Sequence, residues 1–266
     1  MLALKLPLIF ASSLLLIYGL LIAVVWWQQE RLIFQPERLA ADHRFAFGSD
    51  VHEIWVDVPG AQLNALHLQL PQPAGVVFFL HGNAGNLNDW FVNADFYRGL
   101  NLDLYMIDYR GYGKSSGRIE SQQELEADVR AAWAAIAPRY AGLRRVVAGR
   151  SLGSALAAQL AAEIQPDMTL LISPYESMSA LAREHYRWVP PFVLRYPLST
   201  ADALARVRTP VLLVHGTRDE LIAPAHSERL LKAAPQATHL LIEGAGHNDL
   251  QAFPAYFDGL AAALKP

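Results

Sequence analysis

The chain has 266 residues, of which 53% are hydrophobic and 18% charged, and its formal net charge is −3. This composition is typical of a globular domain with a large core, and the near-neutral charge without a basic cluster argues against a nucleic-acid partner. Cysteine is absent, which excludes disulfides, a thiolate nucleophile and a cysteine zinc site.

The N-terminal residues 1–30 predict a transmembrane anchor. Between Lys5 and Glu30 stand 24 uncharged residues, which as a helix would extend about 36 Å and cross a hydrocarbon core of about 30 Å. Trp26 and Trp27 close this segment, where interfacial aromatic side chains are expected. A cleaved signal peptide usually has a shorter apolar run with small residues before the cleavage site, and a buried core helix is rarely apolar on every face.

The flanking charges leave the orientation of this helix open. Lys5 and the amino terminus on one side are nearly balanced by three arginines between residues 31 and 44 on the other. We adopt a single-pass arrangement with the domain outside the cytoplasm, in a periplasm or lumen. The spacing of Gly19 and Ala23 would allow a homodimer through the transmembrane helix, although lipid packing explains that spacing equally well.

Residues 31–266 predict one α/β domain, which begins with a connector. Two alternating runs, at 52–58 and 63–70, predict an antiparallel pair of edge strands joined at Pro59-Gly60. Continuous apolar runs, typical of parallel strands buried on both faces, follow at 76–80, 102–107, 146–148, 168–172, 211–214 and 239–242. Helical stretches are expected at 121–137, 151–164, 227–234 and 253–264. This alternation predicts a doubly wound, mostly parallel sheet of about eight strands.

The segment from Gly149 to Gly153 (GRSLG) has the pattern G-x-S-x-G between a predicted strand and a predicted helix. The two glycines suit a turn so tight that side chains two positions from Ser151 would collide. Such a turn lifts the hydroxyl above the sheet at a helix N-terminus. Ser151 is therefore a candidate nucleophile, and the alternative is an ordinary helix N-cap.

A serine hydroxyl needs a base, and the base needs an acid that fixes its tautomer. His247 lies in a glycine-rich loop after the last predicted strand and is the candidate base. Asp219 follows the penultimate strand and is the preferred acid, with Glu220 and Asp249 as alternatives. Carboxyl ends of parallel strands meet at one edge of a sheet, so these residues are expected to lie together.

The loop from His81 to Asn86 (HGNAGN) follows the strand at 76–80 and is a candidate oxyanion hole. We assign its donors to the backbone N–H groups of Asn83 and Leu152, and a glycine-rich turn of structural use is the alternative. A histidine or asparagine side chain in this loop, such as His81 or Asn86, belongs to the same sheet edge.

Together with DYRGYGKSSG at 108–117, HGTRDELIAP at 215–224 and GAGHND at 244–249, these motifs resemble the α/β-hydrolase superfamily, and more closely its membrane-anchored serine hydrolases of the serine aminopeptidase-like type. The resemblance covers residues 31–266. It implies the α/β-hydrolase fold with a Ser151–Asp219–His247 triad and no cofactor or metal. Asp108, Tyr109 and Arg110 are expected to shape the site rather than react.

A cap insertion is expected at about 174–208, where aromatic residues and prolines gather. A membrane anchor together with an aromatic cap predicts hydrolysis of carboxylic esters or thioesters, including lipid acyl esters, by an esterase, lipase or thioesterase. The aromatic side chains of the cap would also serve simply to pack it onto the sheet. A peptidase, an acyltransferase and a silent membrane-tethered binding module remain alternatives.

Overall fold

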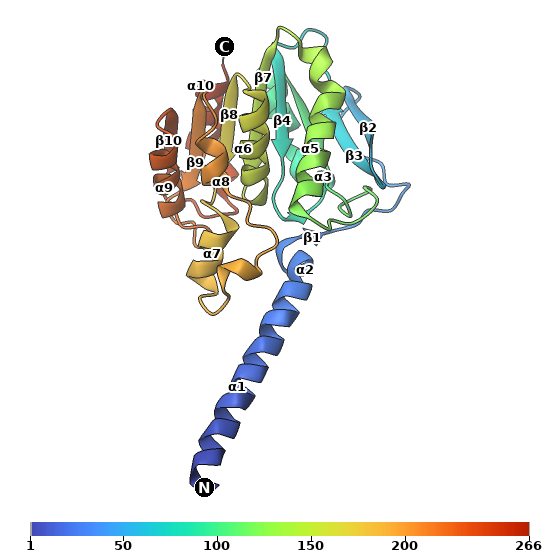
Figure 1. Ribbon diagram of the computed structural model, residues 1–266. Helices are drawn as coiled ribbons and strands as arrows, with labels where there is room; N and C mark the ends of the chain where they lie inside the picture. The colour runs from blue at the N-terminus through green and yellow to red at the C-terminus, as the bar shows by residue number, and fades with distance from the viewer. Residues whose placement is uncertain (1, 266) are drawn as a thin grey trace.

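An eight-stranded mixed sheet forms the centre of the computed structural model, which describes residues 2–265 and the side chains from residue 9 onward (Figure 1). The strand order is β10-β9-β8-β7-β4-β6-β3-β2. Antiparallel pairing joins β2 to β3 and β3 to β6, and all other neighbours are parallel. The expected antiparallel edge and the predicted sheet of about eight strands are both confirmed.

The strands of this sheet are β2 (Val51–Val58), β3 (Ala61–Leu68), β4 (Gly75–Leu80), β6 (Leu102–Ile107), β7 (Arg144–Arg150), β8 (Met168–Ile172), β9 (Val211–Gly216) and β10 (Ala237–Ile242). A separate parallel pair joins β1 (Gln35–Pro36) to β5 (Ala84–Gly85). Most central strands are buried on both faces, as their continuous apolar runs predict. The exception is β10, which is half-exposed because it forms the edge of the sheet.

Helices cover both faces of the sheet, and each face has its own hydrophobic core. One face carries α5 (Gln122–Ile136), η2 (Ala137–Tyr140), α6 (Leu152–Ile164), α8 (Thr200–Leu204) and α9 (Ala225–Ala233). The other carries α3 (Leu87–Trp90), η1 (Phe91–Asn93), α4 (Ala94–Gly99), η4 (Leu250–Ala252) and α10 (Pro254–Leu264). This double winding places the carboxyl ends of the parallel strands at one end of the domain.

The predicted cap region lies over that end of the sheet. It contains α7 (Met178–His185) and η3 (Pro191–Val193), both at the end of the domain nearest the N-terminal helix (Figure 1). By contrast, α8 packs against α6, and its Leu204 belongs to the core. The part that stands over the sheet therefore ends before α8.

Two helices precede the domain: α1 (Leu2–Trp27) and the short α2 (Gln29–Ile33). Within α1, the stretch Ile9–Trp27 is long and apolar enough to cross a membrane, with a mean hydropathy of 2.4 and no part of that window buried. In Figure 1, α1 projects away from the sheet on the side of the cap. Length and composition fit both a membrane anchor and a signal segment.

A buried hydrogen-bonded group of side chains, far from the carboxyl ends of the parallel strands, predicts how the stability of the protein depends on pH. His67 contacts the Tyr140 hydroxyl, which donates to Asp103, and Gln69 lies beside the other ring nitrogen of His67. Burial lowers the pKa of His67 from 6.5 to about 4. The unfolded chain therefore binds a proton at His67 that the folded chain does not bind, so the contribution of His67 to stability falls as the pH drops from about 6.5 to about 4, by about 3 kcal/mol.

Thermal unfolding in detergent at several pH values in this window measures the effect. His67→Gln keeps a donor for Tyr140 but cannot be protonated, so its stability should change less between pH 7 and pH 4 than that of the wild type. His226 and His239, whose pKa values are also lowered mainly by burial, remain in both proteins. Identical pH profiles for the two proteins would contradict the assignment.

Candidate active site

Ser151 stands in a strained turn between β7 and α6. Its φ of 51° lies in the left-handed region, which a serine adopts only when the surrounding structure imposes it. A Cβ at Gly149 would overlap the carbonyl of Gly153, and one at Gly153 would overlap the carbonyls of Leu80 and His81. The glycines therefore have the steric role that the G-x-S-x-G pattern predicts.

The Ser151 side chain does not cap the helix that it opens. Although Ser151 occupies the N-cap position of α6, its hydroxyl makes no capping hydrogen bond. The hydroxyl oxygen instead lies 3.1 Å from Nε2 of His247. Of the two interpretations that the sequence allows, the structure favours the one in which the hydroxyl faces a histidine.

His247 links this hydroxyl to Asp219. Its Nδ1 lies 2.7 Å from Oδ2 of Asp219, and because a carboxylate only accepts hydrogen bonds, Nδ1 carries the proton. Nε2 is then free to accept from Ser151. The backbone of the loop is also held, since the Arg150 guanidinium donates to the carbonyl of His247 at 2.6 Å. The three residues predicted as a triad are thus brought into one hydrogen-bonded chain.

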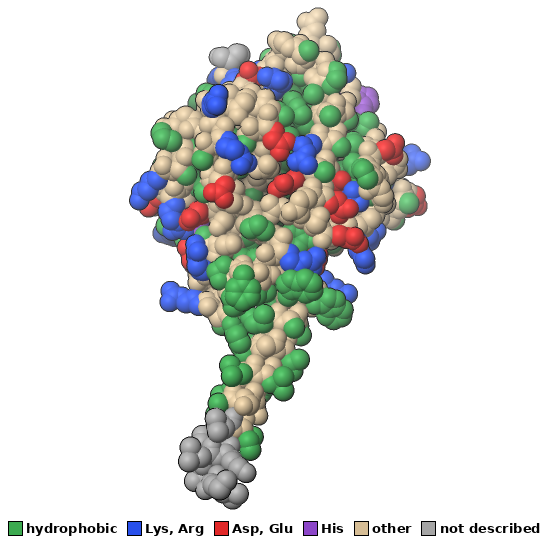
Figure 2. Space-filling view, in the orientation of Figure 1, with side chains coloured by type: hydrophobic (Ala, Val, Ile, Leu, Met, Phe, Trp, Pro, Cys, Tyr) green, Lys and Arg blue, Asp and Glu red, His purple; other side chains and the backbone are tan. Residues whose placement is uncertain are grey.

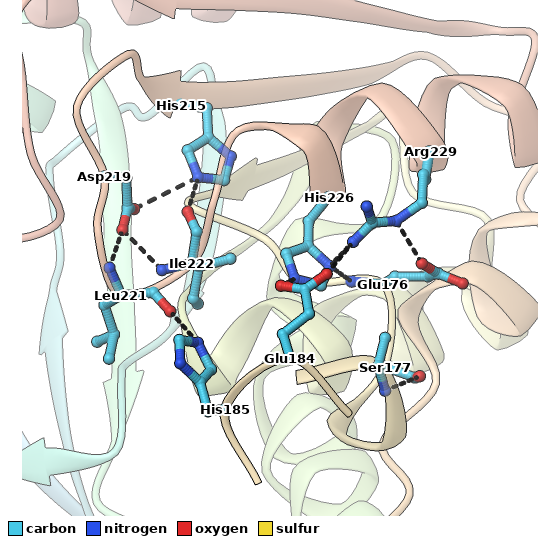
Figure 3. Close-up of polar contacts among 11 residues, drawn as sticks. Glu176, Ser177, Glu184, His185, His215, Asp219, Leu221, Ile222, His226 and Arg229 are labelled. Carbon is cyan, nitrogen blue, oxygen red and sulfur yellow. Dashed lines mark hydrogen bonds and ion pairs between the residues drawn. The ribbon is translucent and has the colours of Figure 1, made fainter. Parts of the chain in front are cut away.

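The Asp219 carboxylate is buried, and both of its oxygens have polar partners (Figure 3). Its Oδ1 accepts from the backbone N–H groups of Leu221 and Ile222, at 3.0 and 2.8 Å, and Nε2 of His215 lies 3.3 Å from Oδ2. Burial raises the pKa of Asp219, but the hydrogen bonds from His215, His247 and Ile222 outweigh it and hold the pKa well below its ordinary value. The carboxylate therefore stays ionised beside His247.

The two alternative acids have other roles. Glu220 is exposed to solvent. Asp249 accepts from the backbone N–H of Gly246 at 2.7 Å and so shapes the loop that carries His247. The geometry therefore favours Asp219 over both.

The loop after β4 lies beside Ser151. Its Asn83 carbonyl accepts from the Gln35 backbone and from the Tyr112 hydroxyl, at 2.8 and 2.7 Å. A Cβ on Gly82 would crowd the ring of Trp90 and lie 3.7 Å from the Cβ of Ser151. Glycine at this position thus lets the loop approach the serine, with Asn83 and the start of α6 on the same cavity.

Two polar side chains of this loop do not reach the cavity. His81 is fully buried, with Nδ1 at 2.8 Å from the carbonyl of Gly82 and Nε2 at 3.4 Å from Asp108. Asn86 caps α3 in a reciprocal arrangement with Asp89. Both residues stabilise the loop.

The motif that begins at Asp108 only partly matches expectation. Asp108 accepts from the backbone of Leu87 and Tyr109 donates to the carbonyl of His81, so these two residues hold the loop beside the site. Arg110 instead forms a buried ion pair with Asp128 on α5. The expectation that Arg110 shapes the site is therefore wrong, because its side chain joins α5 to the turn after β2.

A cavity of about 480 Å³ begins at Ser151 and is mostly apolar. No acidic or basic side chain other than a histidine stands among its described lining residues. The lining residues come from α1 and α2, the loops at the site, and the cap: Val25, Gln29, Leu32, Ile33, Asn83, Ser151, Leu152, Tyr175, Met178, Leu181, Ala182, His185, Tyr186, Trp188, Val189, Leu194, Leu221 and Ile222.

A polar cluster fixes the cap on the core (Figure 3). Glu184 of α7 contacts His226 and Arg229 of α9, at 3.0 and 2.9 Å, and Arg229 also pairs with Glu176. Nearby, Nε2 of His185 lies 3.2 Å from the carbonyl of Leu221, in the loop that holds Asp219. The cap and the acid loop are therefore held in one arrangement.

The roles of several of these residues were not predicted from the sequence. His215 was visible at the end of a strand, but nothing in the sequence showed that it would face Asp219 rather than solvent. Arg150 occupies a variable position of the G-x-S-x-G pattern, yet it donates to the His247 loop and lies over the ring of Trp90. Nothing in the sequence indicated that α2 would line the cavity. Among the described residues, no cluster of three or more histidines and carboxylates could hold a metal ion.

Comparison with known proteins gives consistent results. The serine aminopeptidase S33 family model matches residues 71–196. The chain is 34% identical over 251 residues to an uncharacterised protein of Mycobacterium tuberculosis, covering 90% of this chain and 85% of the relative. It is 33% identical over 214 residues to α/β hydrolase domain-containing protein 17C of Xenopus tropicalis, covering 77% of this chain and 67% of the relative.

Two solved structures have a similar fold. A Pyrococcus furiosus esterase superimposes with a TM-score of 0.68 at 17% identity, covering 87% of this chain and 97% of the esterase. Est1E of Butyrivibrio proteoclasticus, solved with ferulic acid bound, gives a TM-score of 0.62 at 19% identity, covering 80% of this chain and 96% of Est1E.

Proposed function

The chain belongs to the α/β-hydrolase superfamily, and from this premise we propose that it is a membrane-anchored serine hydrolase of carboxylic esters or thioesters with apolar acyl groups. The observation that carries the proposal is the hydrogen-bonded chain from Ser151 through His247 to Asp219 at one end of an apolar cavity. The family supports a hydrolase, and the apolar lining of the cavity supports the proposed class of substrate.

In the proposed mechanism, His247 takes the proton of Ser151 as the hydroxyl oxygen attacks the substrate carbonyl. The backbone N–H groups of Asn83 and Leu152 bind the oxyanion that forms. His247 then protonates the leaving alcohol or thiol, and a water molecule, deprotonated by His247, releases the acid from the acyl-enzyme. Ionised Asp219 stabilises the imidazolium in both halves of the cycle.

The cavity lining argues for an apolar acyl group. Side chains such as Met178, Leu181 and Val189 offer dispersion contacts and no fixed charge. The family model's description makes a serine aminopeptidase the second candidate. An aminopeptidase must bind a free ammonium group, for which a carboxylate is the usual partner, and the described cavity lining contains none.

A chain-length series of p-nitrophenyl esters in detergent tests this function. We expect kcat/KM to rise about fourfold per methylene until the cavity is filled, because each added methylene leaves water. Aminoacyl naphthylamides should be poor substrates. Turnover of the acetate alone, or preference for the naphthylamides, would reject the proposal, and product analysis with added glycerol separates hydrolysis from acyl transfer.

Asp219→Asn should lower kcat about 10⁴-fold, because a neutral amide stabilises neither the correct tautomer nor the imidazolium of His247. Steady-state hydrolysis of a long-chain ester measures the change. Asp249→Asn is the matched control, since its side-chain oxygen can still accept from Gly246, and it should keep most of the activity. Equal losses in the two variants would remove Asp219 from the mechanism.

A further inference from the structure

The junction between α1 and the cap is made of specific polar contacts. The Gln29 side chain is buried, donates to the carbonyl of Val193 at 3.0 Å and accepts from the backbone of Arg195 at 2.6 Å. The next residue, Glu30, accepts from the Tyr196 hydroxyl and pairs with the Arg195 guanidinium at 2.7 Å. The end of the N-terminal helix is therefore docked on the cap and does not lead into a loose linker.

A further contact places the cap beside the apolar part of α1. The Tyr18 hydroxyl donates to the carbonyl of Trp188 at 2.9 Å. Tyr18 precedes Trp27 by nine residues, which is about 13 Å along a helix. The edge of the cap thus runs alongside the uncharged stretch Ile9–Trp27, which is long enough to cross a membrane.

The same edge of the cap exposes large apolar side chains. Phe192 is 87% exposed, and Tyr186 and Trp188 are about half-exposed. We call these three residues the cap face. Figure 2 shows apolar side chains gathered where α1 meets the domain, with Lys and Arg side chains beside them and further charged side chains spread over the rest of the domain. An exposed group of aromatic residues of this kind is typical of a surface that contacts a membrane or a partner.

The cavity opens at this edge. Its inner end is at Ser151, and its lining includes Val25 of α1, Leu32 of α2, and Tyr186 and Trp188 of the cap face. Leu32 is also exposed, at 59%, so the cavity lining reaches the surface between α1–α2 and the cap. An acyl chain that enters there passes along apolar side chains to the serine.

From these contacts we propose that the cap face inserts into the near leaflet of the bilayer that α1 crosses, beside the last turns of the apolar stretch of α1, and that acyl chains pass from the leaflet into the cavity without crossing water. The substrate is then an ester or thioester whose acyl chain resides in the membrane. Continuity with α1 identifies the occupant of the cap face as a bilayer rather than a second protein. The part concerning substrate rests on the proposed hydrolysis of esters, whereas the position of the cap face rests only on the proposed membrane anchor.

A fluorescent label tests the position directly. The chain has no cysteine, so Phe192→Cys gives a single site for a polarity-sensitive nitrobenzoxadiazole label on the full-length protein in phosphatidylcholine vesicles. Leu143→Cys is the control, because Leu143 is 37% exposed immediately before β7, at the end of the sheet opposite Ser151. We expect the label at 192, and not at 143, to shift its emission to the blue and to be quenched by phosphatidylcholine carrying a nitroxide high on its acyl chain.

Kinetics test the route of the substrate. Phe192 does not line the cavity, so Phe192→Glu should slow hydrolysis of a vesicle-embedded palmitate ester about fivefold, while hydrolysis of a soluble butyrate ester stays unchanged. Leu143→Glu should change neither rate. Loss of both activities in Phe192→Glu, or no loss of either, would overturn the route.

The outcomes separate the two proposals. Labels at 192 and 143 that behave alike would overturn the position of the cap face even if long-chain esters are hydrolysed in detergent. Quenching at 192 without any hydrolysis of long-chain esters in detergent would leave the cap face in the bilayer and reject the proposed function.

Discussion

Replacement of Ser151 by alanine should lower kcat for ester hydrolysis about 10⁶-fold and abolish covalent labelling by a fluorophosphonate probe. The Ser151 hydroxyl is placed to attack a carbonyl and pass its proton to His247, whose Nε2 lies 3.1 Å away. Alanine removes the nucleophile but keeps the backbone of the turn, so the protein should fold normally. Steady-state assays and probe labelling of the full-length protein measure both effects.

Ser154→Ala is the matched control for the labelling experiment. This serine lies one turn further along α6, and its hydroxyl donates to the carbonyl of Ser151 at 2.6 Å. It is fully buried and does not line the cavity. Ser154→Ala should keep the probe label, whereas a label that persists in Ser151→Ala would place the nucleophile elsewhere.

Gly153→Ala should be strongly destabilising for a change of a single methyl group. The added Cβ would overlap two backbone carbonyls of the neighbouring strand end, those of Leu80 and His81. Backbone atoms of a central strand cannot move aside as a flexible side chain can, so we expect a loss of at least about 3 kcal/mol in the free energy of unfolding. Activity should fall with it, since Leu80 and His81 lead into the Asn83 loop.

Gly99→Ala offers the corresponding control. A Cβ at Gly99 meets nothing within 4 Å, and the residue ends α4. Alanine there should be neutral or slightly stabilising, because it reduces the freedom of the unfolded chain. Thermal unfolding of the two variants under one condition measures the difference, and equal melting temperatures would contradict the steric account of the turn.

Local sequence patterns predicted much of this structure because their causes are local. A continuous apolar run such as 76–80 must be shielded on both faces, which identifies a central strand. The glycines around Ser151 predicted a tight turn from sterics alone, and the positions of His247 and Asp219 after consecutive strands placed them at one edge. For these elements, the short-range pattern and the tertiary contacts favour the same structure.

Other features depend on which segments meet in three dimensions. The run at 239–242 looks as apolar as a central strand, yet β10 is half-exposed because no strand follows it in the sheet. Arg110 stands next to site-forming residues in the sequence, but its partner Asp128 lies on another element. The contacts of Gln29 likewise join distant segments, so no local pattern could reveal them.

The buried Gln29 junction has a consequence for kinetics. If α1 crosses a bilayer as proposed, a domain bound to its own helix at this point has little freedom to swivel, and Ser151 then stays at a nearly constant height relative to the lipid headgroups. With its cavity mouth fixed at that height, the enzyme encounters substrate by lateral diffusion in two dimensions. The variable that sets its rate is then the mole fraction of ester in the membrane, and diluting the vesicles in buffer should leave turnover per enzyme unchanged.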